Sequence, residues 1–276
     1  MANHKKMVQT SIKKNYIYNT IYQVLSLITP LITAPYIART LGTEGVGIYS
    51  YTYSVAQYFL LFAMLGISNH GNRSIAAVRE DDCKLSRTFW SIYSIQAFMY
   101  VLAIIAYLIY LFAFNVDNKT IVAIQFIYVV SGALDISWYF FGTEQFKITV
   151  TRNMIIKIAT VILMFIFVHN PGDLAKYTVI MAGGTFLSQA YLWTYIFRQV
   201  DVVKVNWIDI KKHIKEVIIL FIPVIAYSIY KLMDKIMLGN MTTYMQVGYY
   251  ENAGKIINIP MGIITFIIGI TFTIVN

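Results

Sequence analysis

Residues 89–112, FWSIYSIQAFMYVLAIIAYLIYLF, decide the class of this protein, because no charged residue interrupts them. A helix that rises about 1.5 Å per residue needs about 20 apolar residues to cross roughly 30 Å of hydrocarbon. The stretch also lacks the two-residue alternation of a membrane β-strand. We therefore predict a transmembrane helix here.

Seven further apolar runs have a comparable character. The chain is 58% hydrophobic and only 13% charged, whereas a typical soluble domain is about 25% charged. We therefore predict an all-α polytopic membrane protein with about eight transmembrane helices. The other seven runs are residues 16–37, 46–67, 121–141, 155–168, 177–197, 217–238 and 254–275.

Lysine and arginine alternate between rich and poor gaps along these runs. Of the 22 cations, 15 lie at the amino terminus or in the gaps after the second, fourth and sixth runs. Short loops rich in Lys and Arg stay in the cytoplasm. The pattern predicts a plasma (inner) membrane protein with a cytoplasmic amino terminus. Since these loops account for the net charge of +9, nucleic-acid binding is not predicted.

Prolines mark possible bends in three of the runs. Pro30 and Pro35 lie in the first run, Pro223 in the seventh and Pro260 in the eighth. A broken membrane helix is tolerated where its freed carbonyl groups find partners or face a wet cavity. The alternative at each proline is a simple packing kink.

An internal repeat links the first and seventh runs. Leu41-Gly42 precedes a Gly-plus-aromatic start of the second run, and Leu238-Gly239 precedes a similar start of the eighth, at an offset of about 200 residues. Parallel repeats of this kind are a known transporter design. We expect residues 1–200 to form a six-helix lobe, 201–216 a basic cytoplasmic linker, and 217–276 the first two helices of an interrupted second lobe.

Four stretches resemble the Wzx-type polysaccharide or O-antigen repeat-unit flippases of the multidrug and oligosaccharidyl-lipid exporter superfamily. They are spread in order over almost the whole chain. They are PYIARTLG at residues 35–42, NRSIA at 72–76, DISWYFFG at 135–142, and Asp234-Lys235 before Leu238-Gly239.

The resemblance implies a MATE-like fold of two six-helix lobes and no covalent chemistry. It also implies export of an undecaprenyl-diphosphate-linked oligosaccharide by alternating access. The implied partners are this lipid-linked oligosaccharide, membrane lipids, a polysaccharide polymerase and other assembly proteins. This chain departs from the pattern because helices nine onward are absent, so we expect an incomplete copy.

Ionisable groups at membrane depth are functional candidates by default. We expect the cations to form a substrate-binding cavity for phosphate oxygens, with tyrosine and glutamine side chains meeting the sugars. The alternative for each charged group is a structural ion pair, or a lysine that extends to the headgroups. The cations are Arg39, Lys231, Lys235 and Lys255, the carboxylates are Asp135, Asp234 and Glu251, and the sugar candidates are Tyr16, Gln23, Tyr53 and Gln57.

Asp135 permits two hypotheses. It titrates or binds a cation and so couples transport to an ion gradient, or it forms a salt bridge with Arg152 or Lys157 and holds one end of the first lobe.

Two other function classes remain as alternatives. A cation-coupled multidrug exporter of the same superfamily would need an acidic or aromatic cavity. A membrane-embedded glycosyl- or acyltransferase would need a nucleophile or an acid–base pair on a sizeable loop. The four histidines are scattered, and Cys83 is the one cysteine, so we predict no catalytic residue, no metal site, no cofactor and no disulfide.

Overall fold

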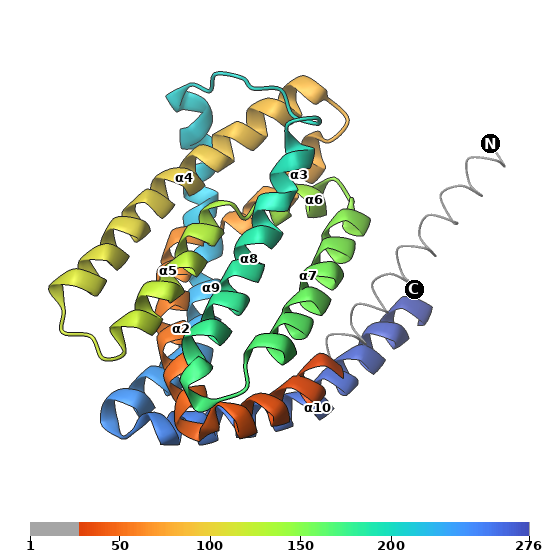
Figure 1. Cartoon of the computed structure of the whole chain (residues 1–276). Coiled ribbons are helices and arrows are strands. Elements are labelled where there is room, and N and C mark those ends of the chain that lie inside the picture. Colours follow the sequence, from red (N-terminus) through yellow and green to blue (C-terminus); the bar gives the residue numbers. More distant parts are fainter. Residues whose placement is uncertain (1–27, 276) are drawn as a thin grey trace.

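The computed structural model describes residues 28–275, and the backbone alone at residues 230, 259 and 263–275. Every regular element in this range is helical, which confirms the all-α prediction. The helices lie mostly side by side in one bundle (Figure 1). Residues 28–40 are helical, followed by α2 (Gly42–Met64), α3 (Ile67–Val78), α4 (Asp82–Ala113), α5 (Lys119–Ala133), α6 (Ser137–Gly142), α7 (Phe146–Phe167), the 3-10 helix η1 (Pro171–Asp173), α8 (Leu174–Ile196), α9 (Trp207–Met241) and α10 (Tyr244–Val275).

Three gaps that are rich in cations meet at one end of the bundle, which we call the basic end. Arg79 forms an ion pair with Glu144, joining the α3–α4 and α6–α7 connections. Gln145 and Gln199 donate to each other's side-chain oxygens at 3.0 and 2.9 Å, joining the α6–α7 connection to the segment after α8. The cation-rich gaps, which alternate with cation-poor gaps along the sequence, therefore lie together at one end of the bundle.

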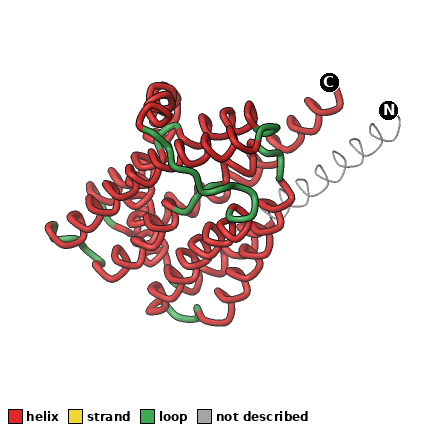
Figure 2. Tube along the Cα trace, turned by 90° about the horizontal axis from the view of Figure 1, so that it is seen from above, coloured by secondary structure: helices red, strands yellow, loops and turns green. Residues whose placement is uncertain are grey.

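The cation-poor connections meet at the opposite end. The Tyr244 hydroxyl donates to Asp117 at 3.3 Å, and the Tyr36 hydroxyl donates to the carbonyl of Val168 at 2.6 Å. Figure 2, turned by 90°, shows that helix makes up most of the described chain.

Within residues 28–275, three helical segments are long and apolar enough to span a membrane: Asp82–Ala113, Lys119–Gly142 and Phe146–Phe167. A fourth is the pair Trp207–Ile229 and Lys231–Met241 within α9, counted as one span bent by 44°. By length and composition, at most four of the eight predicted runs therefore qualify as membrane spans among the described residues. The α2 and α8 runs contain many Tyr, Ser, Thr, Gln and Gly residues, which lower their hydropathy, and residues 16–27 of the first run lie outside the described range.

The run predicted over residues 121–141 is two helices, α5 and α6, separated at residues 134–136. The buried amide of Gln96 donates to the carbonyl of Asp135 at 2.8 Å and lies 3.3 Å from that of Gly132. The indole of Trp138 donates to Gln96 Oε1 at 2.9 Å, and that of Trp193 donates to the carbonyl of Leu134 at 3.0 Å. The break is tolerated because side chains satisfy the carbonyl groups that it frees.

The predicted proline bends do not coincide with the breaks. Helix continues through Pro30, Pro35, Pro223 and Pro260, and the bend in α9 lies at residue 230. The α2–α3 break instead falls at Leu65, whose φ is +48°.

Helices α2 and α10 cross at glycines of the internal repeat. A Cβ added to Gly47 would collide with the carbonyl of Tyr244, and one added to Gly248 would collide with the carbonyl of Thr43. Thr43 and Gly47 correspond to Tyr244 and Gly248 at a constant offset of 201. Each repeat therefore contributes its glycine to one contact and its equivalent partner residue to the other. This reciprocity is the pattern of a twofold-related interface.

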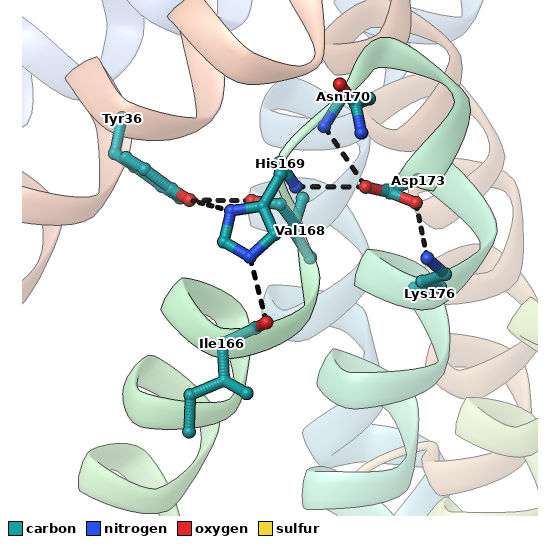
Figure 3. Close-up of polar contacts among 7 residues, drawn as sticks. All are labelled: Tyr36, Ile166, Val168, His169, Asn170, Asp173 and Lys176. Carbon is teal, nitrogen blue, oxygen red and sulfur yellow. Dashed lines mark hydrogen bonds and ion pairs between the residues drawn. The ribbon is translucent and has the colours of Figure 1, made fainter.

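The α7–α8 turn is closed by one carboxylate (Figure 3). Asp173 accepts from the backbone N–H groups of His169 and Asn170 at 2.9 and 3.0 Å and pairs with Lys176 at 2.7 Å. The bond from Lys176, followed by the backbone donors, lowers the pKa of Asp173 to about 2. The helix over residues 28–40 is attached to this turn through Tyr36.

We expect Gly248→Ala to destabilise the α2–α10 crossing by about 1–3 kcal/mol, because the methyl group meets backbone that cannot move aside. The measurement is the thermal unfolding midpoint of the purified protein in detergent. Gly254→Ala, in the same helix with nothing within 4 Å, is the control and should leave the midpoint unchanged. Equal midpoints for the two variants would contradict the close approach.

We expect Asp173→Ala to accelerate amide hydrogen exchange at His169 and Asn170 several-fold. Because the folded pKa lies below the ordinary value of about 3.9, the carboxylate stabilises the turn above that pH and loses this effect as the pH falls through about 2. Asp209→Ala, which removes a similar Lys pair elsewhere, is the control. Unchanged exchange in Asp173→Ala would refute the role of the carboxylate.

Candidate functional site

A polar cavity of about 340 Å³ opens between α2, α5, α8 and α9. Its size falls in the range of small-molecule sites, and its lining mixes apolar surface with hydroxyl and amide groups. Tyr53 and Gln57, two of the predicted sugar candidates, are in the lining, while Tyr16 and Gln23 lie outside the described residues. The polar residues that line it are Tyr53, Gln57, Ser68, Tyr100, Tyr128, Ser131, Asp135, Thr185, Gln189 and Ser228.

Asp135 is the charged residue of this lining. It sits at the α5–α6 break, and its carboxylate accepts from the backbone N–H of Ser137 at 3.0 Å. The ion pairs among the described residues do not include Asp135. Arg152, one of its suggested partners, donates to Gln189 and to the carbonyl of Ser188 at 3.0 and 3.2 Å. The break itself presents this carboxylate to the cavity.

Four tyrosines form an aromatic group beside the cavity, from α2, α5 and α8. The hydroxyl groups of Tyr49 and Tyr128 lie 3.0 Å apart. Tyr53 stacks on Tyr49, with ring centroids 5.8 Å apart, and meets Tyr128 edge-on at 4.9 Å. Tyr177 meets Tyr49 edge-on at 4.8 Å. Such faces and hydroxyl groups suit an amphipathic ligand such as a sugar.

Three of the seven predicted ionisable residues come together in a second cluster, the Glu251 cluster, made of Ser50, Lys235, Glu251 and Lys255. Lys235 Nζ lies 2.6 Å from Glu251 Oε2, and Lys255 Nζ lies 3.6 Å from Oε1. The Ser50 hydroxyl donates to Oε2 at 2.8 Å. The charged side chains are between 19% and 29% exposed, so this is a largely buried site with one surplus positive charge.

Three other predicted ionisable residues, Arg39, Lys231 and Asp234, are not part of this cluster. Asp234 accepts from the Tyr250 hydroxyl at 2.7 Å, and Lys231 lies over the ring of Tyr227, 4.8 Å from its centroid. Both charged residues are exposed, as is Arg39. The lining of the polar cavity contains none of the four predicted cations. Among the described residues, two of the predicted lysines therefore lie in the Glu251 cluster, apart from the polar cavity.

The fold also brings together two histidines that are 143 residues apart. His70 Nε2 lies 2.8 Å from His213 Nδ1, and His70 Nδ1 lies 3.0 Å from Glu216 Oε2. This geometry suits a neutral His70 that donates to the carboxylate and accepts from His213. The pair joins α3 to the first turns of α9 at the basic end. No spacing in the sequence indicated this contact.

Two comparisons with known proteins found a match, and a third found none. A family model described as "Polysaccharide biosynthesis protein" matches residues 12–272. The chain belongs to this family. It is 26% identical over 268 residues to the "Putative O-antigen transporter" of Escherichia coli (strain K12), covering 92% of this chain and 62% of that relative. The chain thus spans less than two thirds of the relative's length. No solved structure matches.

Family membership confirms the predicted resemblance. The transporter relative and the apolar helices place the protein among membrane proteins of polysaccharide biosynthesis.

We expect acidification to weaken the α3–α9 contact. Burial lowers the pKa of His70, an effect that Glu216 partly opposes. A histidine whose folded pKa is lowered stabilises the fold above its ordinary pKa of about 6.5, and this contribution is lost as the pH falls below that value.

The measurement is the unfolding midpoint of the purified protein between pH 8 and pH 5. In His70→Asn, the free energy of unfolding should change less steeply with pH. The slope should fall by at most the value for one proton, about 1.4 kcal/mol per pH unit. His169→Asn, which changes a histidine of the α7–α8 turn, is the control and should retain the wild-type slope. A wild-type slope in His70→Asn would refute the assignment.

Proposed function

We propose that this chain forms part of a flippase that moves undecaprenyl-diphosphate-linked oligosaccharide repeat units across the plasma membrane by alternating access. The observation that carries the proposal is a polar, aromatic cavity in a helical member of the polysaccharide biosynthesis protein family. Its hydroxyl and amide groups suit the sugars. Transport of this kind needs no covalent chemistry and serves capsule, exopolysaccharide or O-antigen synthesis.

The architecture we propose has a first lobe over residues 1–200 and the beginning of a second at residue 217. The exchanged contacts of Gly47 with Tyr244 and of Gly248 with Thr43 support two repeats related by a twofold axis. Residues 207–216 of the proposed linker are the first turns of α9. The remaining linker, residues 201–206, is not helical.

The orientation we propose has the basic end in the cytoplasm, with the amino terminus on the same side. Cation-rich connections gather at that end, and cytoplasmic loops carry the excess of Lys and Arg. The substrate would load there, and the polymerase that extends the repeat units would receive it on the other side.

One observation favours the multidrug exporter. Asp135 and the tyrosines of the cavity could hold a cationic aromatic compound. Extrusion of a cationic dye by cells that express the protein would support this second function. Dye extrusion without any effect on surface polysaccharide would overturn the first.

We expect Gln57→Leu and Gln189→Leu each to weaken binding of a lipid-linked oligosaccharide to the purified protein in nanodiscs by about tenfold. Each change leaves a sugar hydroxyl without its partner, a loss of roughly 1–2 kcal/mol. Gln246→Leu, an exposed position on α10, is the control.

The cellular test is restoration of surface polysaccharide in a host that lacks its flippase. It uses this chain alone and a fusion extended by the unmatched segment of the E. coli relative. Rescue by either protein that disappears in Gln57→Leu but not in Gln246→Leu is the expected result. Rescue that is insensitive to both cavity substitutions would contradict the assigned cavity.

A further inference from the structure

The carboxylate of Glu251 is engaged by three helices at once. One oxygen accepts from Ser50 of α2 at 2.8 Å and from Lys235 of α9 at 2.6 Å. The other faces Lys255, one turn further along α10, at 3.6 Å. Glu251 therefore links the two units of the internal repeat through a largely buried contact.

The two lysines are engaged to different extents. The contact with Lys235 is a short charge-assisted hydrogen bond. The distance to Lys255 exceeds that of a hydrogen bond, so this pair is held by charge attraction alone. Lys255 can therefore change its partner with little loss of bonding.

A cavity of about 220 Å³ adjoins Lys255. It lies between the helix over residues 28–40 and helices α7, α8 and α10, and its lining also includes Lys157, Thr33, Thr160 and Tyr177. Two ammonium groups with hydroxyl groups around them form a setting for a phosphate, whose oxygens accept several bonds. The rest of the lining is largely apolar and suits the beginning of an isoprenoid chain. Its remaining residues are Thr29, Pro30, Ala34, Ile37, Val161, Met164 and Met181.

We propose that Glu251 is a resident counter-ion that occupies the lysines until the diphosphate of the lipid carrier displaces it. This inference rests on the proposed function, and it assigns the lipid diphosphate to the cavity beside Lys255. A diphosphate carries more charge than one carboxylate, so it competes for Lys255 first and then for Lys235. As Glu251 leaves the lysines, the bond from Ser50 is the contact that continues to hold α10 to α2 within this cluster. Arrival of substrate thereby loosens the α9–α10 contact.

The test measures binding of geranylgeranyl diphosphate and of geranylgeraniol to the full chain in nanodiscs. Glu251→Gln should bind the diphosphate about tenfold more tightly, because it removes the competing charge, and should bind the alcohol unchanged. Lys255→Gln should bind the diphosphate about tenfold more weakly. Asp234→Asn is the matched control, since Asp234 accepts from Tyr250 on an exposed surface, and should match the wild type.

A second variant preserves the test if Glu251→Gln does not fold. Ser50→Ala keeps all three charges of the cluster but removes one hydrogen bond from the carboxylate, so it should tighten diphosphate binding about twofold. The unfolding midpoint of each variant shows whether it is folded.

The outcomes separate the two proposals. If the wild type prefers the diphosphate to the alcohol but the folded Glu251 or Ser50 variants bind it no more tightly, the counter-ion inference is overturned and the flippase proposal stands. If no protein prefers the diphosphate, recognition of a diphosphate lipid is overturned as well, and the counter-ion inference falls with it.

Discussion

Gln96 is the side chain on which the described bundle most depends. It is fully buried on α4, and its amide occupies the gap between α5 and α6, where it donates to the carbonyl of Asp135 and lies close to that of Gly132. A freed carbonyl in an apolar environment is costly, and Gln96 removes that penalty while its own oxygen accepts from Trp138. The break can therefore exist in an apolar segment, and it brings Asp135 to the wall of the polar cavity. Gln96, Trp138 and Asp135 therefore connect the support of the helix break to the lining of the polar cavity.

Helix α9 connects the features that the proposed transport uses. At the basic end it is attached to α3 through His213 and His70, and further along it contributes Ser228 to the polar cavity and Lys235 to the Glu251 cluster. Helices α2 and α10, which occupy equivalent places in the two repeats, cross where glycine permits direct backbone contact. In a rocking transporter, these polar contacts are the ones that must open and close.

Much of the fold could be predicted from the sequence, and the reasons are local. Apolar run length predicted helices, and the four-residue spacing of Glu251 and Lys255 lets these side chains meet on one helix face. The break at residues 134–136 could not be predicted, because the stretch has no proline and the supporting amide comes from Gln96 on another helix. The basic composition of residues 207–216 predicted a polar segment at this point, and in the structure these residues are the first turns of α9. For the site, two of the predicted sugar candidates, Tyr53 and Gln57, lie in the cavity lining, and α8 brings Thr185 and Gln189 there.

The sequence by itself determined the helical class and which connections share an end, since both follow from composition over stretches of about 20 residues. Long apolar runs must form helices in lipid, and clustered cations must stay on one side of it. Only the tertiary structure decided which polar groups meet. His70 with His213, Ser50 with Glu251 and Gln96 with Asp135 are distant in the chain, and their contacts depend on how each helix is rotated and where it is broken. That rotation is set by packing among all the helices together, which no local pattern of residues contains.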